Sequence, residues 1–233
     1  MTEARAFSTE AAVHWYLPLM HELATRIDLV ARACDGQLNL SPPFAHEYAY
    51  LQFRRICELM ALGCLQLHGD LPAAQTQSAK KEWSAERIMR LLQKDHPHSF
   101  PQCVAREKTA DGWKINANTK PNALSLAEFK TLYAECGEVL HRGTIRRLES
   151  TGPLALSDYQ KVIAWQAKIV DLMNEHLVGR ASGTSLYVVS LRTEPGFPEC
   201  SVFTLNSTGG MDVATIKMNI QSAGPNDSHD EPR

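Results

Sequence analysis

The stretch Ile56-Cys57-Glu58-Leu59-Met60-Ala61-Leu62-Gly63-Cys64-Leu65 decides the fold class, because it is apolar on nearly every side of a helix. A helix with this pattern is surrounded by other elements and does not lie on a surface. Ser41 stands at the N-cap position, and Pro42 suits the first helical turn that follows. We therefore predict a central helix from Pro42 to about His68.

Amphipathic stretches on both sides of this segment supply its neighbours. Apolar residues three and four positions apart predict helices over about 8–34, 85–93, 125–142 and 157–177. Pro18 predicts a kink or a break in the first of them. The last two begin with capping boxes, in which a serine oxygen accepts a backbone N–H and the side chain three residues later reaches back. These boxes are Ser125-Leu126-Ala127-Glu128 and Ser157-Asp158-Tyr159-Gln160.

After Gly179 the spacing of the apolar residues changes from that of a helix to about two, which is typical of strands. We predict strands over 185–192, 200–205 and 213–218, joined by short turns into an antiparallel meander. Further upstream, residues 103–107 and 113–116 flank an Asp111-Gly112 turn and predict a small hairpin.

The predicted fold class is therefore α+β, a mainly α-helical bundle with a small C-terminal antiparallel sheet. The bundle occupies residues 8–180, the β region 181–220, and a polar, Gly- and Pro-containing disordered tail 221–233. A chain of 233 residues can bury a core of this kind without disulfides or metal ions.

Composition points to a cytoplasmic protein. The N-terminus lacks the basic start and apolar core of a signal peptide, and we expect no membrane association because no apolar run is long enough to cross a bilayer. The six cysteines form no C-x-x-C pair, and we expect free thiols in a reducing compartment. The net charge of −2 neither favours nor excludes a nucleic acid as partner.

Arg54, Arg55 and Glu58 carry charge into the most apolar helix. Residues three and four apart lie on one helical face, so either arginine can pair with Glu58. A buried charge must be paired or hydrogen-bonded, or it is strongly destabilising. One interpretation is a structural ion pair that orients two helices; the alternative is a polar site at the edge of the bundle.

A second charged group follows the helix over 125–142. His141, Arg142, Arg146 and Arg147 gather one imidazole and three guanidinium groups in a short span. Cations at this end suit the helix dipole, but the same group could hold a phosphate or an RNA backbone. Glu138 and His141 form a single E-x-x-H unit, whereas di-metal carboxylate bundles need two. We therefore expect no metal site and no cofactor.

Two stretches resemble uncharacterised bacterial helical families that are similar to the HEPN superfamily. These are Arg54-Arg55-Ile56-Cys57-Glu58-Leu59 and Tyr133-Ala134-Glu135-Cys136-Gly137-Glu138-Val139-Leu140-His141-Arg142-Gly143. The resemblance covers roughly residues 48–147 and implies a helical bundle that dimerises and works in bacterial defence or regulation. Active HEPN members are metal-independent ribonucleases with an arginine four to six residues before a histidine. In this chain His141 precedes Arg142 instead.

The resemblance and the residues together give two functional hypotheses. The first is a non-catalytic, HEPN-like interaction protein that forms a homodimer or binds an RNA or protein partner. The alternative is a metal-independent ribonuclease, in which His141 and Arg142 are catalytic and Arg146 and Arg147 bind the phosphate.

Overall fold

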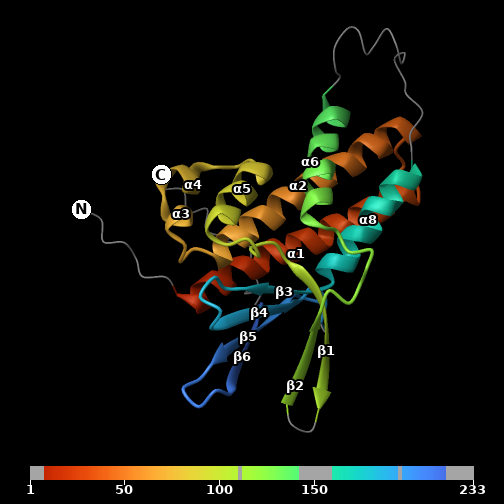
Figure 1. The fold of residues 1–233 in the computed structure, drawn as a ribbon. Coiled ribbons are helices and arrows are strands. Elements are labelled where there is room, and N and C mark those ends of the chain that lie inside the picture. Colours follow the sequence, from red (N-terminus) through yellow and green to blue (C-terminus); the bar gives the residue numbers. More distant parts are fainter. Residues whose placement is uncertain (1–7, 110–111, 142–158, 194–195, 219–233) are drawn as a thin grey trace, which may run out of the picture.

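The chain forms a layer of helices packed on one face of a six-stranded antiparallel sheet (Figure 1). The computed structural model describes residues 8–109, 112–141, 159–193 and 196–218. The fold class is therefore α+β, as the sequence predicts. No helix in these ranges is both long enough and apolar enough to cross a membrane.

Two long helices organise the helical layer. Helix α1 spans Thr9–Cys34, with the Ser8 side chain as its N-cap, and Pro18 does not divide it. Helix α2 spans Pro42–Leu67 and contacts α1, α5, α6 and α8, but it is not surrounded on every side as predicted, because Leu51 and Leu62 remain exposed. The ring of Tyr16 packs against Gly63, where an added Cβ would lie 2.6 Å from Cε2 of that ring. This glycine lets α1 and α2 approach closely.

We expect Gly63→Ala to destabilise the protein by about 1–3 kcal/mol, because the added methyl group overpacks the contact with Tyr16. The matched control is Gly137→Ala in α6, where a Cβ would meet nothing within 4 Å. Alanine there should stabilise the helix by about 0.5–1 kcal/mol. Urea unfolding of both variants measures the two changes. Equal effects of the same sign would contradict the close contact.

The shorter helices complete the layer around α2. They are α3 Pro72–Gln75, α4 Gln77–Lys81, α5 Ala85–Asp95, α6 Leu126–Leu140 and α8 Tyr159–Met173. The capping box of α6 is confirmed: Ser125 Oγ accepts the N–H of Glu128, and the Glu128 carboxylate accepts the N–H of Ser125 at 2.9 Å. The predicted cap at Ser157 lies outside the described residues.

The predicted end of the last helix, near Leu177, is wrong. Helix α8 ends at Met173, and strand β3 follows over Glu175–Gly179. His176 and Val178 point into the core in the two-residue alternation of a strand, and Leu177 pairs with Val188 of β4. Pairing with the next strand, β4, therefore overrides the local helical pattern.

The sheet is larger than the sequence predicts. Its order is β2-β1-β3-β4-β5-β6, and all neighbours are antiparallel. The predicted hairpin is confirmed as β1 Gln102–Thr109 and β2 Gly112–Ala117, and the three predicted strands as β4 Ser185–Ser190, β5 Glu199–Leu205 and β6 Met211–Lys217. Three strands come from the range 8–180 that the sequence assigns to the bundle. The predicted tail at 221–233 lies outside the described residues.

The sheet curls so that the face away from the helices is concave. Arg106 of β1 donates to Ser190 of β4 at 2.6 Å and to Ser201 of β5 at 3.3 Å, and it pairs with Glu175 of β3. In a flat sheet β1 and β5 would lie about 14 Å apart, farther than an arginine side chain reaches. The curl buries a second apolar cluster on this face, formed by Val104, Val188 and Phe203.

Candidate functional site

Helix α2 exposes an apolar stripe along its outer surface, formed by Phe44, Leu51 and Leu62. Leu51 and Leu62 follow Phe44 by 7 and 18 positions, which places all three at nearly the same angle around a helix with 3.6 residues per turn. Their exposed fractions are 59%, 40% and 36%. These three apolar side chains recur along one line of the helix, on which Arg55 and Glu58 lie between Leu51 and Leu62, and no element covers them within the described part of the chain.

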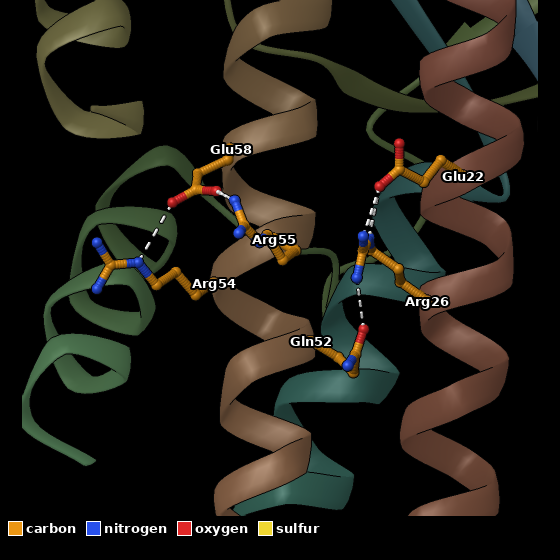
Figure 2. A network of polar contacts seen from close by, with 6 residues as sticks. All are labelled: Glu22, Arg26, Gln52, Arg54, Arg55 and Glu58. Atoms are coloured by element: carbon orange, nitrogen blue, oxygen red, sulfur yellow. Dashed lines mark hydrogen bonds and ion pairs between the residues drawn. The ribbon is translucent and has the colours of Figure 1, made fainter. Parts of the chain in front are cut away.

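The predicted charged trio lies on the same helix, between Leu51 and Leu62, and Figure 2 shows its contacts. Arg54 Nε and Arg55 Nη1 approach the two carboxylate oxygens of Glu58 at 3.2 and 2.9 Å. Arg54 also lies over the ring of Tyr133 in α6. The Glu58 side chain is 13% exposed and that of Arg55 56%, so the trio lies at the edge of the helical core. Arg54 thus joins α2 to α6, and Arg55 remains accessible on the stripe.

A second polar contact links the opposite side of α2 to α1, and the sequence does not predict it. Arg26 of α1 is held by Glu22 at 2.6 Å and donates to the buried amide oxygen of Gln52 at 2.7 Å (Figure 2). The spacing of Glu22 and Arg26 signals a pair within one helix. Nothing in the sequence indicates that Gln52 receives the other end of the guanidinium group.

His141 lies at the C-cap of α6, where its backbone N–H donates to Gly137 at 3.0 Å, and the residue is exposed. Its predicted companions Arg142, Arg146 and Arg147 lie outside the described residues. Glu135, in the same helix, accepts a hydrogen bond from Trp165 of α8 and pairs with Lys161 of α8. Within the described ranges no three His, Cys, Asp or Glu side chains form a group that could hold a metal ion.

A cluster of polar side chains, which we call the histidine cluster, lies where α2 and α5 end. Its members come from segments far apart in the chain and are His68, Asp70, His96, Ser99, Arg180 and Tyr187. The rings of His68 and His96 are 5.0 Å apart, and Arg180 pairs with Asp70 at 2.7 Å. His96 donates through Nε2 to the carbonyl oxygen of Gly179 at 2.8 Å.

Several buried polar atoms of the histidine cluster make no hydrogen bond within the described structure. They include one carboxylate oxygen of Asp70 and the hydroxyl of Ser99. Both ring nitrogens of His68 lack a hydrogen bond of normal geometry, and the backbone of Ser99 gives this imidazole only a weak contact. Burial lowers the pKa of His68 to about 4, and the neighbouring His96 adds to this shift. His68 is therefore a neutral imidazole at pH 7. Buried polar atoms without partners are uncommon in folded proteins and mark this corner as energetically costly.

His176 is equally buried but has both partners. Its Nδ1 donates to the carbonyl oxygen of Met173 at 2.8 Å, and its Nε2 accepts from the hydroxyl of Tyr16 at 2.6 Å. Burial lowers its pKa to about 4 as well. This histidine is a structural link between α1 and β3, which makes it a natural contrast to His68.

Comparisons of this chain with protein-family models, curated proteins and solved structures found no match.

Proposed function

We propose that this chain is a HEPN-like helical interaction protein that forms a homodimer through the stripe on α2. The observation that supports this proposal is the exposure of Phe44, Leu51 and Leu62 along one line of the helix. Exposed large apolar side chains that gather on one face beside charged residues are typical of protein–protein interfaces. The stripe runs for 18 residues, which is about 27 Å along the helix axis.

The stripe is self-complementary about a two-fold axis. Two antiparallel copies centred on Phe53 would place Phe44 opposite the partner's Leu62. The same arrangement would place Leu51 against the aliphatic part of the partner's Arg55, whose charge is already held by Glu58. Such an isologous contact closes on itself and gives a dimer, not a filament.

We expect the wild-type protein to have the mass of two chains, and Leu51→Asp to raise the dissociation constant of the dimer at least about tenfold. The new carboxylate would be buried without a partner in the interface. Light scattering behind size-exclusion chromatography, over a wide range of concentrations, measures both. Trp83→Asp is the control, because Trp83 is also an exposed apolar residue, at 64%, but lies off α2. A single-chain mass at every concentration would exclude the dimer.

A metal-independent ribonuclease acting through His141 is the alternative, and the exposure of this imidazole at the end of α6 favours it. An exposed histidine can act as general base or acid on a 2′-hydroxyl group. We nevertheless expect no cleavage, because His141 precedes Arg142 where active members have the reverse order.

The assay incubates labelled RNA with the purified protein, with and without a chelator. His141→Ala and Arg142→Ala variants that remain folded serve as controls. Chelator-resistant cleavage that both variants lose would contradict our expectation and establish the ribonuclease. Absence of cleavage by the wild type, or equal cleavage by the variants, would remove His141 as a catalytic residue.

A further inference from the structure

Strand β6 forms one edge of the sheet and has a paired strand on one side only within the described residues. It pairs with β5 at seven consecutive positions, from Glu199–Lys217 to Leu205–Met211, so no bulge interrupts the ladder. Six of its seven residues are exposed, and the other, Ile216, is half-buried. The strand therefore presents a regular and accessible edge.

The backbone of β6 points away from β5 at every second residue. Asn206 donates its N–H to the carbonyl oxygen of Gly210 at 2.9 Å, which makes these two residues a hydrogen-bonded pair where the β5–β6 ladder begins. Such pairs alternate along an antiparallel ladder. The residues of β6 whose backbone groups point outward are therefore Met211, Val213, Thr215 and Lys217. Within the described part of the chain no hydrogen bond joins these outward groups to another backbone segment.

This edge lacks the features with which proteins usually prevent further pairing. Edge strands are commonly protected by a central lysine, a proline or a bulge. Residues 213–216 at the centre of β6 include none of these, and the charged residues Asp212 and Lys217 lie toward its two ends. By contrast, β2 at the opposite edge has Lys114 near its centre. Of the two edges of the sheet, β6 is therefore the one that is open to a further strand.

We propose that β6 binds an extended segment of a protein partner, which pairs antiparallel with it as a seventh strand of the sheet. Donors and acceptors that recur about every 6.8 Å are matched by another extended backbone. Val213 lies opposite Phe203 on the concave face and is 43% exposed, so the partner residue beside it is apolar. This inference deepens the interaction role proposed above, but it does not depend on the stripe on α2.

A second copy of β6 fits this edge less well than a different sequence. A two-fold pairing that uses all four outward residues is centred on Ala214. It sets Lys217 opposite Met211 of the other copy, and Asp212 opposite Ile216, so that both charges face apolar side chains. A partner of different sequence can place an acidic residue opposite Lys217 and a basic one opposite Asp212, which stabilises cross-strand pairing.

The chain that follows β6 is also a poor candidate for the seventh strand. Gly224 and Pro225 fall within the stretch that would have to fold back along β6. Both residue types are depleted in strands, and proline cannot donate a backbone hydrogen bond. A separate chain is therefore the favoured occupant.

Fluorescence anisotropy with a labelled synthetic peptide tests this assignment on the full chain. The probe, Glu-Thr-Val-Thr-Val-Lys-Val-amide, places its glutamate opposite Lys217 and its lysine opposite Asp212. We expect a dissociation constant below about 1 mM. N-methylation of the first two valines removes donors that face β6 and should weaken binding at least about tenfold, whereas N-methylation of the two threonines should change it less than about threefold. Equal effects of the two modifications, or no binding of the parent peptide, would overturn the proposal.

Two variants place the peptide on β6. Val213→Pro removes an outward N–H but no hydrogen bond to β5, and edge strands tolerate proline at such positions. Val213→Glu keeps the backbone but sets a carboxylate opposite a valine of the probe. Each should weaken binding at least about tenfold while keeping the circular dichroism spectrum of the wild type. The matched control is Ala117→Pro on β2, because Asn118 donates to Cys103 at 2.7 Å and the N–H of Ala117 therefore points outward.

The control variant Ala117→Pro should bind the probe as the wild type does, and so should Leu51→Asp, which tests the proposed dimer separately. Binding that persists in both Val213 variants, or that is lost in Ala117→Pro, would contradict a site on β6. Light scattering on Val213→Pro distinguishes the remaining occupant. A fall in mass from two chains to one would assign the edge to a second copy and overturn the proposal.

Discussion

Replacing His68 by leucine is expected to stabilise the protein by about 1–3 kcal/mol. Both ring nitrogens of His68 are buried without a hydrogen bond of normal geometry in the described structure. A buried polar atom without a partner costs about 1–3 kcal/mol, and an apolar side chain of similar size removes that cost. Such a stabilisation would show that hydrogen bonds in the folded protein do not offset the desolvation of the His68 ring.

The same change at His176 is expected to destabilise the protein by about 2–4 kcal/mol. Leucine would remove the hydrogen bonds to Met173 and Tyr16, and it would leave the buried hydroxyl of Tyr16 without its partner. The double variant His176→Leu, Tyr16→Phe should recover part of the loss, because it removes the orphaned hydroxyl.

Urea unfolding at pH 7 measures the free energy of unfolding of all four proteins. The two histidines are both fully buried, so burial alone cannot explain opposite signs. If His68→Leu loses more than about 1 kcal/mol, the imidazole is held by partners and the histidine cluster is an ordinary part of the core. A double variant no more stable than His176→Leu would contradict the role given to Tyr16.

The helices could be predicted because their signals are local. Ser8, Ser125 and Glu128 act on backbone groups within three residues, and the structure shows these contacts. Strand β3 could not be predicted, because it directly follows α8 and depends on pairing with β4, which the chain reaches only after a turn. The extension of the sheet to β1 depends on two residue pairs between β1 and β3, far apart in sequence.

In the candidate sites too, contacts between residues close in sequence could be predicted, and contacts between distant segments could not. Arg54 and Glu58 pair because one helical turn separates them, and spacing alone indicates this contact. His68 and His96 meet because two helices end at the same corner, which no spacing reveals. The apolar pattern of residues 56–65 also predicted burial on nearly every side, whereas Leu62 is exposed. Periodicity shows which residues share a face, but neighbouring elements decide which face is covered.

Acid is expected to remove about 6 kcal/mol of stability between pH 6.5 and pH 4, through His68 and His176 together. Burial lowers the pKa of each from 6.5 to about 4, so the unfolded chain binds protons in this window and the folded chain does not. The free energy of unfolding therefore rises with pH across the window, and its histidine part is complete above pH 6.5. Each shift corresponds to about 3 kcal/mol.

Carboxylates contribute to the pH dependence of stability at lower pH than these two histidines do. The pKa of Glu128 is lowered to about 2 by the backbone N–H and the hydroxyl of Ser125, so its contribution is lost only below about pH 4.5. Urea unfolding at intervals from pH 7 to pH 4.5 therefore reports mainly on the histidines. His68→Leu should remove about half of the pH-dependent loss. Gly137→Ala, which is also expected to stabilise but keeps both histidines, should retain all of it. A loss of equal size in both variants would show that His68 takes up a proton in the folded protein as readily as in the unfolded chain.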